Sequence, residues 1–519
     1  MREWEIERVA RASGAEVVGG SRAGQTGPEQ VSIDSRAAGP GRLFVGLKGE
    51  RVDGGVYARQ ALEAGAWGVL VKPEHVRSIV ADGPGGGVVL AHSDPLKALH
   101  DLAKAWLGEL REQGARVIGI TGSTGKTSTK DITAALLEGA GRRTVASPEN
   151  RNTEIGLPLT VLQAPKGTQA LVLEMAMRGK GQIAQLTEIA QPDVGVIVNV
   201  GPVHVEQLGT VEGVVEAKAE LIEGLSAGAT AVVPADEPRL ERYRREGIRT
   251  VTFGPGGDVQ LRERKRDGGV VIDDCGKEIE LRPSFEQAHN LQRNLLAAVA
   301  AVSAVGVTPG GEVRVRFSKM RGQRKELPKG VVVIEDCYNA NPMSMRAAID
   351  DLLNVRDARA RTRARVTAYE EEPDGDALLN VPANDGLANV HDRPNVQDAR
   401  AHTRTRAVAV LGDMLELGKD EQRYHREIGE YARARGVDVL VTVGERAKAM
   451  AGPFAADDRR DEVHSVPDAK GAGELLEARL EPGDTVLVKA SRGVGLERAI
   501  EALAATEPVE PAEPVTAGK

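Results

Sequence analysis

The 519-residue sequence lacks the features of a secreted, membrane-spanning or nucleic-acid-binding protein. It has only two cysteines, Cys275 and Cys337, in no disulfide or metal-ligand spacing, which fits a reducing compartment. It contains no apolar run of about 18 residues, and its charged N-terminus has no apolar core of the signal-peptide type. A net charge of −8 gives no reason to expect nucleic acid or an anionic membrane as a partner. We therefore expect a cytoplasmic protein without a membrane span, working as a monomer.

Aromatic residues are also scarce, at 3%, so Val, Leu, Ile and Ala must fill the cores. Short apolar runs rich in these residues alternate with longer helical patterns. Such alternation predicts an α/β protein whose sheets are mostly parallel. The runs expected to be buried strands are Val117–Thr121, Ala170–Leu173, Val194–Val200, Val331–Ile334, Val408–Leu411, Val439–Val443 and Val486–Val488.

The chain is too long for one hydrophobic core, and three domains are expected. Polar stretches near Gly114 and at 309–312 divide it into residues 1–113, 114–311 and 312–505. The tail 506–519 is rich in Pro and Glu and should be disordered. Within the third domain, residues 354–406 look like an insertion, because Asn354–Arg365 and Asn395–Arg406 match at 9 of 12 positions. A solvated, mobile segment is expected there; an arm that binds a protein or an anion is the alternative.

The clearest motif is a glycine-rich loop between an expected strand and an expected helix. Gly122-Ser-Thr-Gly125-Lys126-Thr127 follows Val117–Thr121 and precedes a helical pattern that ends near Gly139. Glycines let backbone N–H groups turn towards phosphates, and a helix N-terminus adds positive potential. Lys126 would reach the β- and γ-phosphates of ATP, and the Thr127 hydroxyl would bind Mg²⁺. A chance glycine-rich turn is the alternative, since Ile120 stands where the generic motif has glycine.

Two candidate metal ligands follow other expected strands. Glu174 comes directly after Ala170–Leu173, and His204 follows Val194–Val200. Because ligands gather at the carboxyl ends of parallel strands, both side chains should converge on the phosphate loop. His204 could equally be structural. Lys218, in the helical stretch EAKAELIEGL, could equally be an exposed lysine.

The phosphate loop GITGSTGKTS and the segment LVLEMAMRGKGQI…NVGPVHVEQLG…EAKAEL resemble the Mur ligase and folylpolyglutamate synthetase superfamily. The resemblance covers nearly the whole chain apart from 354–406 and the tail. It implies an N-terminal uridine-nucleotide domain, a central P-loop ATPase domain and a Rossmann-like C-terminal domain. It also implies two Mg²⁺ ions held by Thr127, Glu174 and His204, and a carbamylated Lys218 that can approach the metal. Carbamylation needs the neutral amine, which burial would favour.

Other stretches extend the resemblance to nucleotide and substrate positions. They are DSR at 34–36, HNLQRN at 289–294, GQR at 322–324, VVVIEDCYNANP at 331–342, AVLGDMLELG at 409–418 and VLVKASRGVGLE at 486–497. By resemblance, ATP contacts fall on Gly122, Ser123, Thr124, Gly125, Lys126, Thr127, Ser128, Asn290, Asp336, Tyr338 and Asn339, with Asn294 a weaker match. Catalytic roles fall on Lys126, His204, Lys218 and Arg324, and substrate contacts on Asp34, Ser35, Arg36, Asn152, Thr153, Lys489, Ser491 and Arg492. For Asn290 a helix cap is the alternative, and for Lys489–Arg492 a surface turn. Cys337 is expected to be a small buried residue, since no paired base is visible.

Within the family, YNANP and GDMLELG resemble the branch that adds D-alanyl-D-alanine to a UDP-linked muramoyl tripeptide, giving the pentapeptide precursor of peptidoglycan. The implied reaction is ATP-dependent and passes through an acyl phosphate. The alternatives are another Mur-type amino-acid ligase and a P-loop module that binds nucleotide without catalysis. The DNPR motif of the diaminopimelate-adding ligases is absent, and the intact Lys126, Thr127, Glu174, His204 and Lys218 argue against a module that has lost catalysis.

Overall fold

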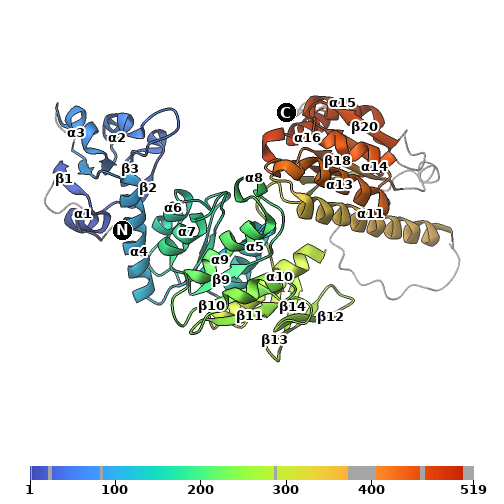
Figure 1. Cartoon of the computed structure of the whole chain (residues 1–519), viewed down its shortest axis with the longest axis horizontal. Helices are drawn as coiled ribbons and strands as arrows, with labels where there is room; N and C mark the ends of the chain where they lie inside the picture. Colours follow the sequence, from blue (N-terminus) through green and yellow to red (C-terminus); the bar gives the residue numbers. More distant parts are fainter. Residues whose placement is uncertain are drawn as a thin grey trace, which may run out of the picture. The chain divides into compact units, whose positions relative to one another are not determined.

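The structure is a computed structural model that describes residues 1, 3–20, 26–81, 86–285, 289–371, 405–455 and 462–505. The chain forms two compact units, Met1–Ser318 and Lys319–Lys519, which together contain three sheets (Figure 1). Most strand pairs are parallel, so the predicted α/β class is confirmed. None of the helices in these ranges is long and apolar enough to cross a membrane. The first part of the predicted insertion, 354–371, continues the helix Pro342–Glu371, in which Val355 is buried, so a solvated segment does not begin at 354. Residues 372–404 and the predicted tail lie outside the described residues.

The first sheet has the strand order β1-β5-β4-β3-β2, with β1 antiparallel to β5 and the other pairs parallel. Its strands are β1 (Glu16–Gly19), β2 (Gln30–Ser32), β3 (Arg42–Val45), β4 (Gly68–Val71) and β5 (Val88–Ala91). The helices around it are α1 (Ile6–Ser13), α2 (Ala58–Glu63), α3 (Pro73–Val80) and α4 (Pro95–Glu112), with 3-10 turns η1 (Ser35–Ala37) and η2 (Gly54–Tyr57). Helix α4 begins sharply because Asp94 accepts from the backbone N–H groups of Leu96 and Lys97, and Pro95 occupies the first turn.

The second sheet has ten strands in the order β15-β14-β13-β12-β11-β10-β9-β6-β8-β7. Its strands are β6 (Arg116–Thr121), β7 (Thr144–Ala146), β8 (Ala170–Glu174), β9 (Val194–Ile197), β10 (Thr230–Pro234), β11 (Arg249–Phe253), β12 (Val259–Arg264), β13 (Val270–Asp274), β14 (Lys277–Pro283) and β15 (Gly311–Val313). Its helices are α5 (Lys126–Gly139), α6 (Gly156–Gln163), α7 (Gln182–Ala190), α8 (Val205–Leu208), α9 (Val211–Glu223) and α10 (His289–Ala304), with η3 (Pro238–Tyr243). The β12–β13 and β13–β14 pairs are antiparallel.

The first two predicted domains lie in one unit because a single apolar core runs through both. Leu99 and Trp106 of α4 belong to the same buried cluster as Leu171 of β8. The predicted boundary near Gly114 falls between α4 and β6, whereas the predicted boundary at 311/312 falls inside β15. The units divide later, after Ser318.

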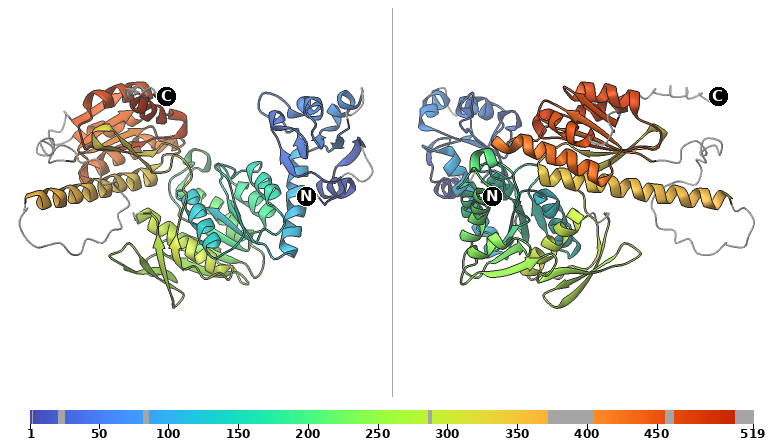
Figure 2. Two further views of the ribbon diagram at one scale, coloured as in Figure 1. Left: turned by 180° about the vertical axis from the view of Figure 1, so that it is seen from behind. Right: turned by 45° about the vertical axis from the view of Figure 1, so that its right-hand side comes forward.

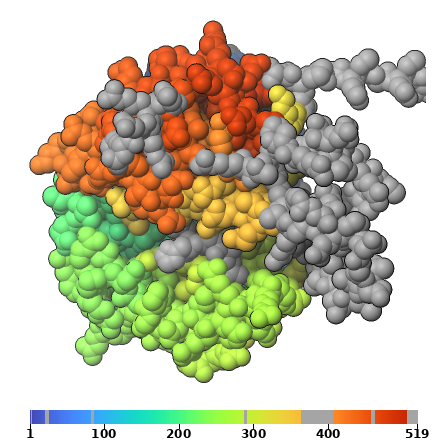
Figure 3. Space-filling view, turned by 90° about the vertical axis from the view of Figure 1, so that its right-hand side faces the viewer, coloured from blue at the N-terminus to red at the C-terminus, as the bar shows by residue number. Residues whose placement is uncertain are grey.

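The third sheet has the order β16-β17-β21-β18-β19-β20, parallel except for β16 with β17 (Figure 2). Its strands are β16 (Gln323–Leu327), β17 (Val331–Asp336), β18 (Ala407–Gly412), β19 (Val439–Val443), β20 (Val463–Val466) and β21 (Thr485–Lys489). Its helices are α11 (Pro342–Glu371), α13 (Glu421–Arg435), α14 (Ala451–Ala455), α15 (Ala469–Arg479) and α16 (Glu497–Ala505), with η4 (Pro328–Gly330), η5 (Gly418–Asp420), η6 (Ala447–Met450) and η8 (Arg492–Val494). Helix α11 packs against α13. The side chains of α11 contribute the gold part of the face drawn in Figure 3.

The expected strands are present, with one correction. The apolar run Val194–Val200 predicts a single strand, but β9 ends at Ile197. Beyond it Val198 still donates to the Thr121 carbonyl, and the Asn199 side chain then bonds to the phosphate loop. Asn199 directs the chain out of the sheet, so the apolar pattern overestimates the length of the strand.

Candidate active site

The phosphate loop lies at the carboxyl end of β6 and leads directly into α5. Gly125 has φ +75°, and a Cβ added there would lie 2.6 Å from Oδ1 of Asn294 in α10. Glycine is thus required both by the backbone conformation and by the close approach of another helix. The Nζ of Lys126 donates to the Gly122 carbonyl at 2.8 Å, which folds the ammonium back over the loop. Backbone N–H groups, a helix N-terminus and an ammonium are thereby gathered at one point, as phosphate binding requires.

Asn199 fixes the shape of this loop, and sequence reasoning missed it. Its Oδ1 accepts from the Thr124 N–H at 2.9 Å, and its Nδ2 donates to the Thr124 hydroxyl at 2.9 Å. The Ser123 hydroxyl accepts from the Gly201 N–H at 2.9 Å and donates to the Gly201 carbonyl at 3.1 Å. A polar residue directly after the apolar core of β9 was the available signal, because such residues lie at the carboxyl edge of a parallel sheet.

Glu174 lies at the centre of the expected metal site. Its carboxylate is buried at the end of β8, where Oε2 accepts from the Thr127 hydroxyl at 2.8 Å and Oε1 from Nδ2 of Asn152 at 2.9 Å. A carboxylate and a hydroxyl suit Mg²⁺, which prefers oxygen ligands. The geometry therefore brings together three residues predicted to serve metal or substrate.

His204 precedes the short helix α8 with φ +53°, a conformation that non-glycine residues adopt at a cost. Backbone strain of this kind gathers at functional sites, which is consistent with the predicted ligand role. The residue is half-buried.

Lys218 is buried in α9, with only 2% of its surface exposed, so it is not the exposed helix lysine that the sequence left open. Burial holds the pKa of the Lys218 amine well below its ordinary value, and the nearby charge of Lys126 lowers it further. The side chain is thus held towards its neutral, nucleophilic form beside the phosphate loop.

The remaining predicted residues of the first unit have mixed positions. Asp34 caps η1 and forms an ion pair with Arg36, whose side chain is 87% exposed. The hydrogen bond from the Arg36 side chain is the main cause of the lowered pKa of Asp34. Ser35 opens η1, and the Thr153 hydroxyl accepts weakly, at 3.5 Å, from the first N–H of α6. The side chains of His289 and Asn290 lie outside the described residues. Asn294, by contrast, is 5% exposed against Gly125 of the phosphate loop.

In the second unit, residues from three strand ends are tied together. Lys489 is 1% exposed, and its Nζ donates to Asp336 Oδ2 at 2.7 Å and to the Asn339 carbonyl at 2.8 Å. The buried Ser491 hydroxyl accepts from the Leu415 N–H at 3.0 Å and donates to the Ala340 carbonyl at 3.4 Å. Lys489 and Ser491 are predicted to face substrate, and in this structure both side chains bond to the segment 336–340.

The other predicted residues of this unit are more open. Arg492 has 58% of its side chain exposed and pairs with Glu497 at 3.3 Å. Arg324 on β16 pairs with Asp351 at 3.6 Å, and Arg321 lies 3.9 Å from the ring centre of Tyr338. Cys337 is buried, and desolvation raises the pKa of its thiol to about 12, so the expectation that it is no nucleophile agrees with its environment.

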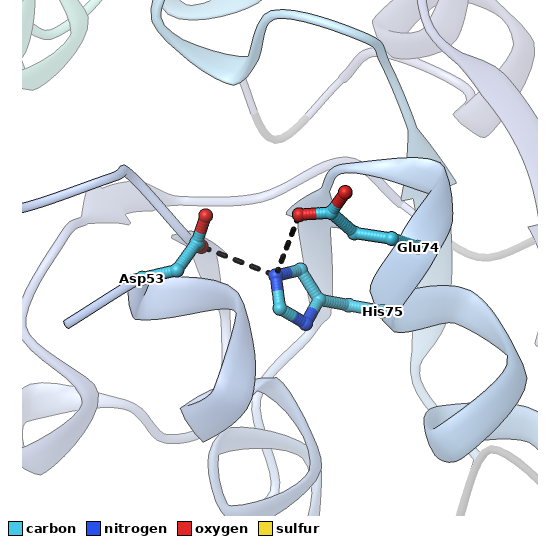
Figure 4. Close-up of side chains that lie close together, drawn as sticks. All are labelled: Asp53, Glu74 and His75. Carbon is cyan, nitrogen blue, oxygen red and sulfur yellow. Dashed lines mark ion pairs between the residues drawn. The ribbon is translucent and has the colours of Figure 1, made fainter.

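A separate polar cluster lies beside the first sheet (Figure 4). Asp53 and Glu74 flank the imidazole of His75, whose Nε2 is 3.2 Å from Asp53 and 3.8 Å from Glu74. These residue types can bind a metal ion, but the ammonium of Lys72 already lies 3.1 Å from Asp53 and 4.0 Å from Glu74. Lys72 therefore already supplies a positive charge to the two carboxylates, and the contacts of Asp53 connect η2 to α3.

Three family models match successive parts of the chain. The model described as "Mur ligase family, catalytic domain" matches residues 28–107, "Mur ligase middle domain" matches 120–302, and "Mur ligase, glutamate ligase domain" matches 394–492. The middle model covers the phosphate loop, Glu174, His204 and Lys218.

Curated relatives match along almost their whole length. The UDP-N-acetylmuramoyl-tripeptide--D-alanyl-D-alanine ligase of Bacillus subtilis is 35% identical over 94% of this chain and 97% of its own. The enzyme of the same name from Mycobacterium tuberculosis is 34% identical over 95% and 97%. Among solved structures, MurF from Acinetobacter baumannii has a TM-score of 0.75 at 25% identity, covering 97% of this chain and 99% of its own. MurF ligase from Thermotoga maritima in complex with ADP has a TM-score of 0.71 at 28% identity, covering 92% and 97%.

Proposed function

The chain belongs to the Mur ligase family, and from this premise we propose that it joins D-alanyl-D-alanine to UDP-N-acetylmuramoyl-tripeptide. It is an ATP-dependent ligase, and the peptide bond forms as ATP is converted to ADP and phosphate. The observation that carries the proposal is the set of Lys126, Thr127, Glu174 and Lys218 gathered at one sheet edge. This set belongs to a chain that aligns from end to end with ligases of that name.

The first step activates the terminal carboxylate of the tripeptide. That carboxylate attacks the γ-phosphorus of ATP, the bond to the β-phosphate oxygen breaks, and an acyl phosphate and ADP result. Lys126 and the loop N–H groups would offset the charge on the phosphoryl oxygens, which is the main catalytic contribution available to such a site. Mg²⁺, when bound at Thr127, Glu174 and His204, supplies further positive charge to the phosphates.

The second step forms the peptide bond. The free amine of D-alanyl-D-alanine attacks the activated carbonyl, phosphate leaves, and the amine loses a proton. The acyl phosphate must be kept from water. We propose that Arg324 and Arg492 contact the reacting groups, and that Asp336, Tyr338, Asn339 and Asn290 contact the nucleotide.

Lys218 is proposed to react with carbon dioxide, its neutral amine forming a carbamate and releasing a proton. The burial of its side chain and the lowered pKa of its amine support this step, because an ammonium ion cannot attack carbon dioxide. The product would carry a negative charge beside the phosphate loop, where it could approach Mg²⁺.

The substrate's uridine part is proposed to bind at Asp34, Ser35 and Arg36, and its peptide part near Asn152 and Thr153. The side chain of Arg36 is exposed and can reach a phosphate, which supports the uridine site. Asn152 bonds to Glu174, which supports a peptide site near the expected metal. The reaction is proposed to take place in the cytoplasm, where ATP is available.

The deciding experiment is phosphate release from ATP with UDP-muramoyl-tripeptide, with and without D-alanyl-D-alanine. We expect release only when both substrates are present, with the pentapeptide product seen by mass spectrometry. Activity with a dipeptide precursor and a single amino acid instead would keep the family and overturn the substrate. Binding of ATP with no release under any pairing would indicate a nucleotide-binding module.

A further inference from the structure

The loop between β7 and α6 contains an arginine whose charge has no partner in the described parts of the chain. The side chain of Arg151 is partly buried, and its Nη1 is buried without a hydrogen-bond partner. No described carboxylate forms an ion pair with the guanidinium either. An arginine keeps its charge when it is buried, so an unpaired N–H group of this kind is costly. The side chain therefore points to an anionic ligand.

The backbone around Arg151 is held in place, so the unpaired guanidinium does not belong to a loosely packed loop. The Arg151 N–H donates to the Pro148 carbonyl at 3.1 Å, and a Cβ added to Gly156, the first residue of α6, would lie 2.5 Å from the Arg151 Cα. Further along the loop, the Glu154 carbonyl contacts Nε2 of His100 on α4 at 2.7 Å. These contacts order the loop before a ligand arrives, which reduces the entropy lost on binding.

Two glutamates close to Arg151 in the sequence do not neutralise it. Glu149 and Glu154 are two and three positions away, and neither forms an ion pair with the guanidinium. Glu149 is exposed, and its φ of +46° is unusual for a residue with a side chain. The local sequence thus offers a salt bridge that the fold does not form, which leaves the guanidinium for an anion from outside the chain.

The position of Arg151 indicates which anion this is. The next residue, Asn152, donates to Glu174 Oε1 at 2.9 Å, so the arginine directly adjoins the contacts of the expected metal ligand. The phosphates of ATP have the Lys126 ammonium and the loop N–H groups to offset their charge. Asn152 and Thr153, which are proposed to contact the peptide part of the substrate, are both uncharged. A carboxylate of that peptide is therefore the anion that matches Arg151.

We propose that the guanidinium of Arg151 binds a carboxylate of the tripeptide and so selects the charged peptide over an uncharged one. The planar guanidinium can donate two parallel N–H groups to the two oxygens of a carboxylate. A carboxamide has one oxygen instead of two and would set its N–H groups against the guanidinium, so it would bind less tightly. This inference rests on the proposed function, because it names a group by which the proposed substrate is recognised.

The test is a binding titration without turnover. UDP-muramoyl-tripeptide, and derivatives in which one carboxylate at a time is replaced by a carboxamide, are titrated onto the full chain with Mg²⁺ and a saturating non-hydrolysable ATP analogue. Arg151→Gln removes the charge, and Arg151→Lys keeps the charge but not the planar fork. Arg111→Gln is the matched control, because that arginine of α4 is also partly buried, with 27% of its side chain exposed, but pairs with Asp193 at 3.3 Å.

We expect Arg151→Gln to weaken binding of the tripeptide by about tenfold or more, since a hydrogen-bonded charge pair is lost, and Arg151→Lys to weaken it less. One carboxamide derivative should bind the unsubstituted chain about as weakly as the tripeptide binds Arg151→Gln. Arg151→Gln should not distinguish that derivative from the tripeptide, whereas Arg111→Gln should. The affinity for the ATP analogue should be the same in all four proteins.

Unfolding without ligand separates a binding role of Arg151 from a structural one. Removing a buried charge that has no partner should leave the melting temperature of Arg151→Gln equal to or above that of the unsubstituted chain. Arg111→Gln, which loses an ion pair, should melt at a lower temperature. A lower melting temperature in both variants, or failure of Arg151→Gln to fold, would show that the guanidinium supports the fold and would overturn the inference.

The binding data can also contradict the inference directly. It fails if Arg151→Gln binds the tripeptide as tightly as the unsubstituted chain does, or discriminates equally against the carboxamide derivatives. Weaker binding of the ATP analogue with unchanged tripeptide affinity would assign the guanidinium to a phosphate instead. If the unsubstituted chain does not bind the tripeptide at all, the proposed substrate is refuted together with this inference. If it binds the tripeptide and releases phosphate, but Arg151→Gln does so equally well, only this inference is overturned.

Discussion

At the scale of single residues, two lysines on different helices of the candidate site differ in environment and in charge. Lys126 begins α5 and folds over the phosphate loop, whereas Lys218 is buried in α9. The positive charge of the first helps to lower the pKa of the second. We therefore propose that Lys126 remains the cation for phosphate, while burial holds Lys218 towards its neutral form.

Replacing Lys126 by Ala should lower kcat by about 10²–10³-fold, the usual loss when one charge-stabilising donor is removed from a preorganised site. Phosphate release with both substrates measures the effect. Lys180→Ala is a suitable control, because that side chain is 60% exposed and pairs with Glu216 on the surface. A Lys126→Ala enzyme with a normal rate would refute the phosphate-loop assignment.

Replacing Lys218 by Ala should reduce activity by about 10–100-fold, because the carbamate that we propose to approach Mg²⁺ would be lost. Added formate or acetate should restore part of it by supplying a carboxylate in the space left by the side chain. Full activity without any added acid would show that no carbamate is needed. Rescue that also occurs in Lys126→Ala would show that the acid acts elsewhere.

At the scale of elements, two helices meet at the phosphate loop. Gly125 leads into α5 in a left-handed conformation, and Asn294 of α10 fills the space where its side chain would stand. The loop is therefore shaped by a helix about 170 residues later in the chain as well as by its own glycines.

Gly125→Ala should weaken ATP binding by more than tenfold, because the left-handed backbone costs roughly 1–2 kcal/mol for alanine and the new Cβ meets Asn294. Titration with an ATP analogue measures it. Gly139→Ala, at the end of the same helix with open space around it, should bind normally and be slightly more stable. Equal affinity of the two variants would contradict the close approach of α10.

The loop after β18 is held by a buried histidine of α13. The Nε2 of His425 accepts from the Met414 N–H at 3.0 Å, and its other ring nitrogen contacts the Glu421 carbonyl at 2.7 Å. Burial lowers the pKa of His425 below its ordinary value of about 6.5. Protonation would place a second N–H against that of Met414 and break the contact.

A pH dependence follows with a definite sign. Because the pKa of His425 is lower in the folded chain than in the unfolded one, the unfolded chain takes up the proton first. The contribution to stability is complete above about pH 6.5 and is lost as the pH falls towards the folded pKa. The unfolding midpoint should therefore drop between pH 7 and 5, and less so in His425→Gln. The same measurement on His464→Gln, which removes a less buried histidine whose pKa is also lowered, separates the contribution of His425 to the pH dependence from that of His464.

At the scale of the whole molecule, the duplicated segment can be tested by removing it. Deleting residues 366–406 joins Arg365 to Ala407 and leaves an arginine in front of β18, where Arg406 now bonds to Asp484 at 2.7 Å. Arg359 and Arg406 both contact Thr485, the first through its guanidinium and the second through its carbonyl. In the shortened chain Arg365 takes the place of Arg406, so six residues, which span up to ~20 Å, lead from Arg359 to the new arginine.

The shortened chain should therefore keep its activity and unfold within a few degrees of the full one. Circular dichroism melting and phosphate release measure this, and deleting 361–401 instead, which leaves the same length but shortens α11 further, is the comparison. A large loss of activity in both deletions, with unchanged unfolding midpoints, would favour the alternative that the segment has a binding role.

The sequence by itself determined the α/β class, most strands, the phosphate loop and the family. These properties depend on local patterns: apolar runs define buried strands, and a glycine-rich turn with Lys126 and Thr127 is recognisable from neighbouring residues alone. The overlong prediction for β9 shows the limit of such patterns, because only the contact of Asn199 with Thr124 decides where that strand ends.

Only the tertiary structure decided which polar residues are buried and what they contact. Nothing near Lys218 in sequence reveals that it is 2% exposed beside Lys126, nor that Lys489 supports Asp336. The extent of the first unit, with α4 sharing the core of the second sheet, and the burial of the Arg151 Nη1 without a partner were equally out of reach. Burial and charge pairing depend on residues hundreds of positions apart, and these meet only when the chain has folded.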